Sequence, residues 1–413
     1  MSRFPLTSLR LAALVGVIAT ASCMPDDGPT PPSEPADLRA GPQNPALVAA
    51  GRDIFRFDTF GDETFWSDTL ELHEVIRGTI GDGISPVEAL GVGLKVDLDA
   101  LPQTIRDGIV DGTISLTDPA TTVALLSLDA VVGVMGEVEG GVLTRVGITC
   151  ALCHSTVDNA FDDGIGRRLD GWPNRDLAVG AIIALSPYIQ ARPELLTVYQ
   201  SWDPGMYDPR FNQDGLNHPV VLPPAFGLRH VKKEIYTGDD DVSYWNAYVA
   251  ITQMHGHGTF VDSRIGVSES NPPDMVTPKL PALRAYQLSL ETPDPLPGEF
   301  DPAAAQRGHA VFNGVAKCAG CHRSEFYTDI NAGILHEPDE VGQDPAYALR
   351  SVTKLYRTTP LRGLWHPPQL TGPYFHDGSA QTLEDVVNHY VTVLGLSLTA
   401  QQRSDLVEYL KSL

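Results

Sequence analysis

Two short cysteine motifs with the same spacing constrain this chain more than any other feature of its sequence. Cys150-Ala151-Leu152-Cys153-His154 and Cys318-Ala319-Gly320-Cys321-His322 both read C-x-x-C-H, and together they use four of the five cysteines. This is the attachment sequence for c-type haem, in which two thiols bond to the vinyl groups and the histidine ligates the iron. The sequence therefore predicts two covalently bound haems c. We expect Cys150, Cys153, Cys318 and Cys321 to attach them, with His154 and His322 as iron ligands.

Two other uses of paired cysteines compete with this interpretation. Two C-x-x-C pairs can form a zinc site, but the stretch between Cys153 and Cys318 is far longer than the spacing of a zinc ribbon. A redox-active C-x-x-C is expected in a thioredoxin-like β-α-β context, which the sequence does not indicate. Both alternatives leave the two adjacent histidines unexplained.

The first residues have the pattern of an export signal. Residues 1–22 begin with Arg3 and Arg10, continue with an apolar run over 11–21 and end just before Cys23. The run is too short to span a bilayer, and small residues before a cysteine resemble a bacterial lipoprotein signal. We expect a lipid on Cys23 that holds the protein on the periplasmic side of a bacterial membrane. An ordinary secretory peptide is the alternative. The proline-rich residues 23–45 favour a semi-extended tether.

The composition limits the partners of the chain. Its 413 residues contain 29 Lys and Arg against 52 Asp and Glu, a formal charge of −23. So acidic a chain is repelled by phosphate backbones, and no local basic patch offsets the total. We therefore expect no nucleic acid partner. The length is sufficient for about two domains.

The pattern around each motif predicts two related units. The helical pattern of residues 306–312 precedes the second motif closely, whereas its counterpart at residues 51–55 lies far ahead of the first motif. The difference indicates an insertion at about 58–145, in which residues 65–76 predict a helix and residues 131–149 predict a hairpin around Gly140-Gly141. We expect a mainly α fold of two cytochrome c-type haem domains with long loops and this small β-hairpin insertion in the first. The first domain would span 46–295 and the second 296–413.

The last segment, residues 399–413, predicts an amphipathic helix that begins with a capping box at Thr399 and Gln402. In small cytochromes c such a terminal helix packs on the helix before the haem motif. We therefore expect Tyr409 or Leu410 to contact Gly308 and Phe312.

Three segments after the second motif resemble the C-terminal domain of di-haem cytochrome c peroxidases and of the related methylamine-dehydrogenase maturation enzyme. They are TPLRGL at 359–364, TGPYFHDG at 371–378 and TLEDVV at 382–387. The resemblance covers about 301–413 well and 146–260 more weakly. It implies a di-haem redox protein. It also implies an axial tyrosine, Tyr390, at the place where the peroxidases have a methionine and the maturation enzyme has tyrosine.

The group opposite each motif histidine decides between electron transfer and small-molecule chemistry. At the second haem, His389, His376 and His366 are alternatives to Tyr390. At the first haem, Met254 as ligand would give a closed electron carrier. His255 or His257, standing off the iron, would instead act as a general base for peroxide. A turn whose histidines only satisfy backbone groups is the third interpretation of this run.

Two further residues are candidates for roles around the haems. Arg362 is expected to neutralise a haem propionate, because a guanidinium matches a carboxylate bidentately. Trp172 is expected to lie between the haems as an electron bridge, although most tryptophans only pack in the core.

Three functions are compatible with these residues. The first is a lipid-anchored di-haem enzyme in which the second haem passes electrons to the first, where peroxide or another small oxidant is reduced. The second is an electron-transfer cytochrome with both irons six-coordinate, and an oxygen-activating enzyme is a third. The electron donor would be a small redox protein or a respiratory or photosynthetic component.

Overall fold

The structure is a computed structural model that describes residues 44–323, 325–365 and 372–413. The predicted signal sequence, Cys23 and most of the tether lie outside the described residues, as does His366. None of the described helices is long and apolar enough to cross a membrane.

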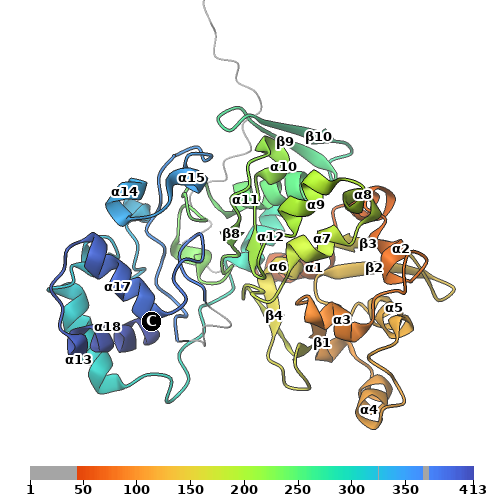
Figure 1. Ribbon diagram of the computed structural model, residues 1–413, viewed down its shortest axis with the longest axis horizontal. Coiled ribbons are helices and arrows are strands. Elements are labelled where there is room, and N and C mark those ends of the chain that lie inside the picture. The colour runs from red at the N-terminus through yellow and green to blue at the C-terminus, as the bar shows by residue number, and fades with distance from the viewer. Residues whose placement is uncertain (1–43, 324, 366–371) are drawn as a thin grey trace, which may run out of the picture.

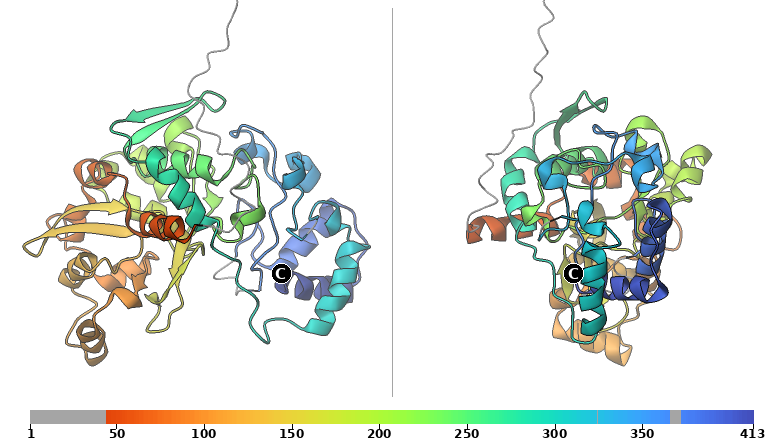
Figure 2. Two further views of the ribbon diagram at one scale, coloured as in Figure 1. Left: turned by 180° about the vertical axis from the view of Figure 1, so that it is seen from behind. Right: turned by 90° about the vertical axis from the view of Figure 1, so that its left-hand side faces the viewer.

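The chain forms two bodies that lie side by side, a larger one from α1 to α12 and a smaller one from α13 to α18 (Figure 1). The views from behind and from the side show the same division (Figure 2). The α-helices of the larger body are α1 (Pro45–Phe57), α2 (Leu72–Ile76), α3 (Pro86–Gly91), α4 (Gln103–Asp111), α5 (Pro119–Ser127), α6 (Ala151–His154), α7 (Val179–Ala184), α8 (Pro187–Gln190), α9 (Pro193–Tyr199), α10 (Phe211–Asp214), α11 (Val242–Tyr248) and α12 (Leu280–Gln287). Those of the smaller body are α13 (Pro302–Asn313), α14 (Pro338–Val341), α15 (Pro345–Ala348), α17 (Leu383–Val393) and α18 (Ala400–Lys411). Short π or 3₁₀ turns are η1 (Thr64–Thr69), η2 (Leu98–Ala100), η3 (Leu228–His230), η4 (Val249–Gln253), η5 (Thr277–Lys279), η6 (Cys318–Gly320) and η7 (Ile330–Ala332).

The strands form separate two-stranded pairs rather than one sheet. They are β1 (Val96–Asp97) with β5 (Ile165–Gly166), β2 (Val134–Glu139) with β3 (Val142–Ile148), β4 (Ser155–Val157) with β6 (Arg168–Asp170), β7 (Met206–Tyr207) with β8 (Val220–Val221), and β9 (Gly258–Asp262) with β10 (Val267–Asn271). The fold is mixed, 42% helical and 12% strand, and not as dominantly α as the sequence suggested. Many of these strands are only two or three residues long, too short to leave a periodic pattern in the sequence.

One arrangement of helices occurs in both bodies. In the smaller body α13 crosses α18 so closely that a Cβ on Gly308 would lie 2.0 Å from the carbonyl oxygen of Asp405. Phe312 meets Tyr409 edge-on with ring centroids 5.2 Å apart, which confirms the packing expected for the last helix.

The larger body repeats this crossing between α1 and α12. A Cβ on Gly51 would lie 1.9 Å from the carbonyl oxygen of Ala282. Phe55 meets Tyr286 edge-on at 5.4 Å. In both bodies a glycine is required because the two helix backbones touch at that point. The repeated crossing places each C-x-x-C-H segment beside an equivalent pair of helices.

The inserted residues differ in detail from the prediction. The continuous helix expected over residues 65–76 is divided into η1 and α2, because Glu71 between them has a left-handed backbone with φ 55°. β2 and β3 pair in antiparallel register around Gly140 and Gly141, where the sequence predicted a hairpin. The second of these strands leads directly to the first motif.

Candidate haem sites

The second motif follows α13 and begins with the turn η6. His322 is half-buried, and its Nδ1 lies 2.9 Å from the carbonyl oxygen of Tyr327. Nδ1 therefore carries the proton that this carbonyl accepts, which leaves Nε2 free to ligate a metal. Burial lowers the pKa of His322 and favours the neutral imidazole. A neutral histidine held by a backbone carbonyl is the form that iron requires.

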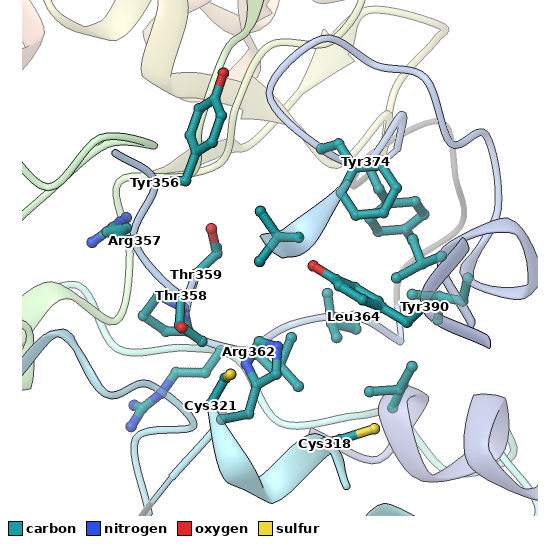
Figure 3. Close-up of a pocket in the computed structure, with 18 of the residues that line it drawn as sticks. Cys318, Cys321, Tyr356, Arg357, Thr358, Thr359, Arg362, Leu364, Tyr374 and Tyr390 are labelled. Atoms are coloured by element: carbon teal, nitrogen blue, oxygen red, sulfur yellow. The ribbon is translucent and has the colours of Figure 1, made fainter. Parts of the chain in front are cut away.

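A cavity of ≈ 320 Å³ borders this motif, and its lining is mostly apolar. Cys318, Cys321 and His322 lie on its border, and the Tyr390 ring reaches into the same space (Figure 3). Tyr390 comes from α17, which begins at a capping box formed by Thr382 and Asp385. Burial raises the pKa of the Tyr390 phenol to about 12. An apolar cavity between a histidine and a tyrosine, with two thiols at its border, fits a covalently attached haem.

The other predicted ligands of this haem have partners of their own. The Nε2 of His389 lies 2.8 Å from the carbonyl oxygen of Val341. The Nε2 of His376 lies 3.0 Å from the Tyr356 hydroxyl, which donates to the carbonyl oxygen of Asp344 at 2.6 Å. His376 also lines the cavity, so it remains an alternative to Tyr390.

Three arginines lie on the cavity lining. Arg362, the predicted propionate partner, donates to the carbonyl oxygen of Glu325 at 3.3 Å and stacks over Phe326. Arg357 forms a buried ion pair with Glu234 at 3.1 Å. The third, Arg175, belongs to the larger body although it borders the cavity of the second motif.

The first motif starts at Cys150 and continues as the short helix α6. His154 repeats the arrangement of His322, because its Nδ1 lies 3.1 Å from the carbonyl oxygen of Pro223. Burial lowers the pKa of His154 to about 4 and raises the pKa of the Cys150 and Cys153 thiols to about 12. The thiols are therefore neutral at pH 7 in the chain without a bound group.

A zinc site built from both motifs finds no support in the described part of the chain. There, the cluster of three or more potential metal ligands consists of Cys321, Asp329 and His336, without the first motif. His336 lies between two carboxylates, with its Nε2 3.0 Å from Asp329 and its Nδ1 3.0 Å from Glu340. Asp329 and His336 are buried on irregular segments without a motif, so no sequence pattern marks this group.

Trp172 is buried on the segment between the two motifs. Gly171 before it donates its N–H to the carbonyl oxygen of His154 at 2.8 Å. The Trp172 ring lies 4.8 Å from the Phe226 ring, and Phe226 lines the cavity of the second motif. Trp172 thus lies beside the first motif, with Phe226 between it and the cavity of the second, and its role as an electron bridge stays a prediction.

The run around Met254 packs against the inserted segment. Met254 is buried in the hydrophobic cluster that includes Ala151, and its carbonyl oxygen accepts from the Trp66 indole at 3.1 Å. His255 stacks on Phe65 at 3.7 Å, and burial lowers its pKa to about 4. His257 donates its backbone N–H to the carbonyl oxygen of Phe60 at 2.8 Å. The roles of Met254, His255 and His257 at the first haem stay predictions.

One polar pair near the first motif was not predicted. The Tyr207 hydroxyl donates to Oε1 of Gln253 at 2.5 Å, and Gln253 donates in turn to Asn212 at 3.0 Å. Tyr207 and Cys153 pack against the same hydrophobic cluster. Tyr207 lies on the two-residue strand β7, so no sequence pattern marks it.

Comparisons with known proteins support haem binding by this chain. Residues 305–413 match the family model described as cytochrome c. The methylamine utilization protein MauG of Methylorubrum extorquens is 32% identical over 127 residues, covering 27% of this chain and 35% of MauG. The cytochrome-c peroxidase IdrP1 of Denitromonas iodatirespirans is 30% identical over 152 residues, covering 27% of this chain and 40% of IdrP1.

A MauG-like protein associated with microbial copper homeostasis has been solved as a crystal structure. It aligns with a TM-score of 0.33 and 21% identity, over 49% of this chain and 75% of that one. The alignments to MauG and IdrP1 span 35% and 40% of the length of these two relatives. The match to the cytochrome c family lies in residues 305–413. The resemblance predicted from the sequence is confirmed: about a quarter of this chain is similar to MauG and to a cytochrome-c peroxidase, and residues 305–413 match the cytochrome c family.

Proposed function

We propose that this protein is an exported di-haem c-type cytochrome in which the second haem passes electrons to the first, where peroxide or another small oxidant is reduced. The observation that carries the proposal is the repeated site. Each C-x-x-C-H segment lies beside an equivalent helix crossing, and each motif histidine has its Nδ1 held by a backbone carbonyl. Covalently bound haem supplies an iron that changes its oxidation state and binds small oxidants at an open position.

At the second site the chain's residues favour electron transfer. Cys318 and Cys321 would attach the haem, while His322 and Tyr390 would hold the iron. The apolar lining would exclude water from the site. With both of these ligands supplied by the protein, this site would exchange electrons and leave small-molecule chemistry to the first.

At the first site the chain's residues would hold the haem and move protons. Cys150, Cys153 and His154 would fix it. Reduction of one peroxide to two waters consumes two electrons and two protons. His255 or His257 is the proposed general base. Burial lowers the pKa of His255 to about 4, so its ring is neutral at pH 7 and would act as a weak base that returns an accepted proton readily.

The proposed location and partners rest on the sequence. A lipid on Cys23 would hold the protein on the periplasmic side of a bacterial membrane. A small redox protein or a respiratory or photosynthetic component would supply the electrons. Covalent haem attachment in bacteria takes place outside the cytoplasm, which agrees with an export signal.

Carbon monoxide binding and peroxide turnover test the proposal together. We expect the reduced protein to show a carbon monoxide shift at one haem only, and to consume peroxide with a reduced small cytochrome as donor. His309→Gln, an exposed histidine on α13, serves as a control that keeps both properties. If neither haem binds carbon monoxide and peroxide is not consumed, the protein is an electron carrier instead.

A further inference from the structure

A short segment of the chain, residues 171–175, lies between the first motif and the cavity of the second. The segment 171–175 lies against the first motif, since Gly171 donates its N–H to the His154 carbonyl and Asn174 donates its N–H to the Cys153 carbonyl at 2.9 Å. Two residues of the same segment, Pro173 and Arg175, line the cavity of the second motif.

A second segment, at Pro223, also contacts both the first motif and the cavity of the second motif. The carbonyl oxygen of Pro223 accepts from Nδ1 of His154, and Pro223 also lines the cavity of the second motif. A charge on either of these segments is therefore close to both candidate haem sites.

Arg175 is the charged residue of the segment 171–175. Its side chain is half-buried, with Nε and Nη1 shielded from solvent. Its neighbour Asn174 donates to the Cys153 carbonyl of the first motif. Arg175 itself interacts with Tyr236 and with Tyr374, which line the cavity of the second. A guanidinium stays protonated even when it is buried. The site thus keeps a positive charge between the two motifs.

The other two arginines of the cavity differ in position. Arg357 is paired with Glu234, and the side chains of both are less than a tenth exposed. Arg362 belongs to the smaller body, where it donates to the Glu325 carbonyl and lies over the Phe326 ring. Haem carries two propionates, and a guanidinium inside an apolar cavity matches a carboxylate in charge and in geometry.

We infer that Arg175 is a positioning residue shared by both haem sites. It binds a propionate of the second haem from across the boundary between the two bodies, and its positive charge raises the reduction potential of both haems. A nearby cation stabilises the site after it gains an electron, and burial strengthens that effect because little water screens it. The inference rests on the proposed function in requiring two haems.

Spectroscopic redox titration of full-length Arg175→Gln and Arg175→Lys tests this inference. The haem content of every variant is measured first, because a wild-type protein with fewer than two haems overturns the proposed function and not the role of Arg175. Arg175→Gln is expected to make both reduction steps at least tenfold less favourable, which is about 59 mV for one electron. Arg175→Lys keeps the charge and should stay near the wild type.

Two control variants locate the effect. Arg362→Gln should lower only one of the two potentials, because Arg362 lies on the second site alone. Arg52→Gln on the outer face of α1, where the side chain is 52% exposed, should change neither. The inference is overturned if Arg175→Gln with two haems leaves either potential unchanged, or if Arg175→Lys falls as far as Arg175→Gln. Loss of one haem in Arg175→Gln but not in Arg175→Lys supports it, and loss in both contradicts it.

Discussion

The two motif histidines are oriented by the same kind of contact. His154 and His322 each have Nδ1 at a backbone carbonyl, of Pro223 and Tyr327 respectively. A carbonyl can only accept, so Nδ1 is the protonated nitrogen in both rings and Nε2 is left available to a metal. These contacts could not be derived from C-x-x-C-H, because Pro223 is far from His154 in the sequence. The motif alone predicts which residue would ligate the iron.

Tyr390→Phe tests the axial ligand of the second haem. Removing the phenol oxygen should change the absorption spectrum of one haem of the two and leave the other as it is. Tyr236→Phe is the matched control, because Tyr236 also lines the cavity but donates its hydroxyl to the Val221 carbonyl. An unchanged spectrum in Tyr390→Phe removes Tyr390 as a ligand and leaves His376 as the alternative among the described residues.

His255→Gln tests the general base at the first site. Peroxide turnover should fall by about 10²-fold or more, the usual contribution of a positioned base. A base must be neutral to accept a proton, and burial lowers the pKa of His255 to about 4. Wild-type turnover should therefore be constant from pH 7 to about pH 5 and fall as the pH approaches 4. A variant as active as the wild type would assign His255 a packing role against Phe65.

At the scale of elements, the glycine-mediated helix crossing organises both bodies. The sequence predicted it for α13 and α18, where the capping box and apolar face of the last helix are continuous. It did not predict α12 as the partner of α1, although Tyr286 follows Ala282 as Tyr409 follows Asp405. The insertion separates α1 from the rest of its unit, so the spacing that marks the second unit is lost in the first.

Gly308→Ala tests this crossing. The new Cβ would lie 2.0 Å from a backbone carbonyl oxygen, so the two helices must move apart. Overpacking of this kind costs about 1–3 kcal/mol, and we expect the upper end because backbone cannot rotate away. Gly91→Ala on α3, whose Cβ would meet nothing within 4 Å, is the control. Equal denaturant midpoints for the two variants would show that the crossing tolerates a side chain.

At the scale of the molecule, buried ion pairs join the two bodies. Arg350 of the smaller body donates to Asp208 at 2.9 Å and to Asp214 at 2.7 Å, and its side chain is only 5% exposed. Asp208 directly follows Tyr207 near the first motif. No sequence pattern predicts these pairs, since they depend on how the two bodies meet. The sequence did indicate two related units. The structure adds that residues of the larger body line the cavity of the second motif and that ion pairs join the two bodies.

Arg350→Gln tests whether the two bodies unfold together. Removing one partner of a buried pair leaves Asp208 uncompensated and costs about 3–5 kcal/mol. We expect one unfolding transition in the wild type and two in the variant, followed by absorption of the haems and by circular dichroism. Arg52→Gln should unfold like the wild type. A single transition at an unchanged midpoint in Arg350→Gln would show that the apolar contacts alone hold the bodies together.

The most direct test of the account is the number of porphyrins on the mature chain. Intact mass and a pyridine haemochrome assay should both give two equivalents of haem c in the wild type. They should give one equivalent in each double variant, Cys150→Ala with Cys153→Ala and Cys318→Ala with Cys321→Ala. One equivalent or none in the wild type, or zinc in place of iron, would contradict it.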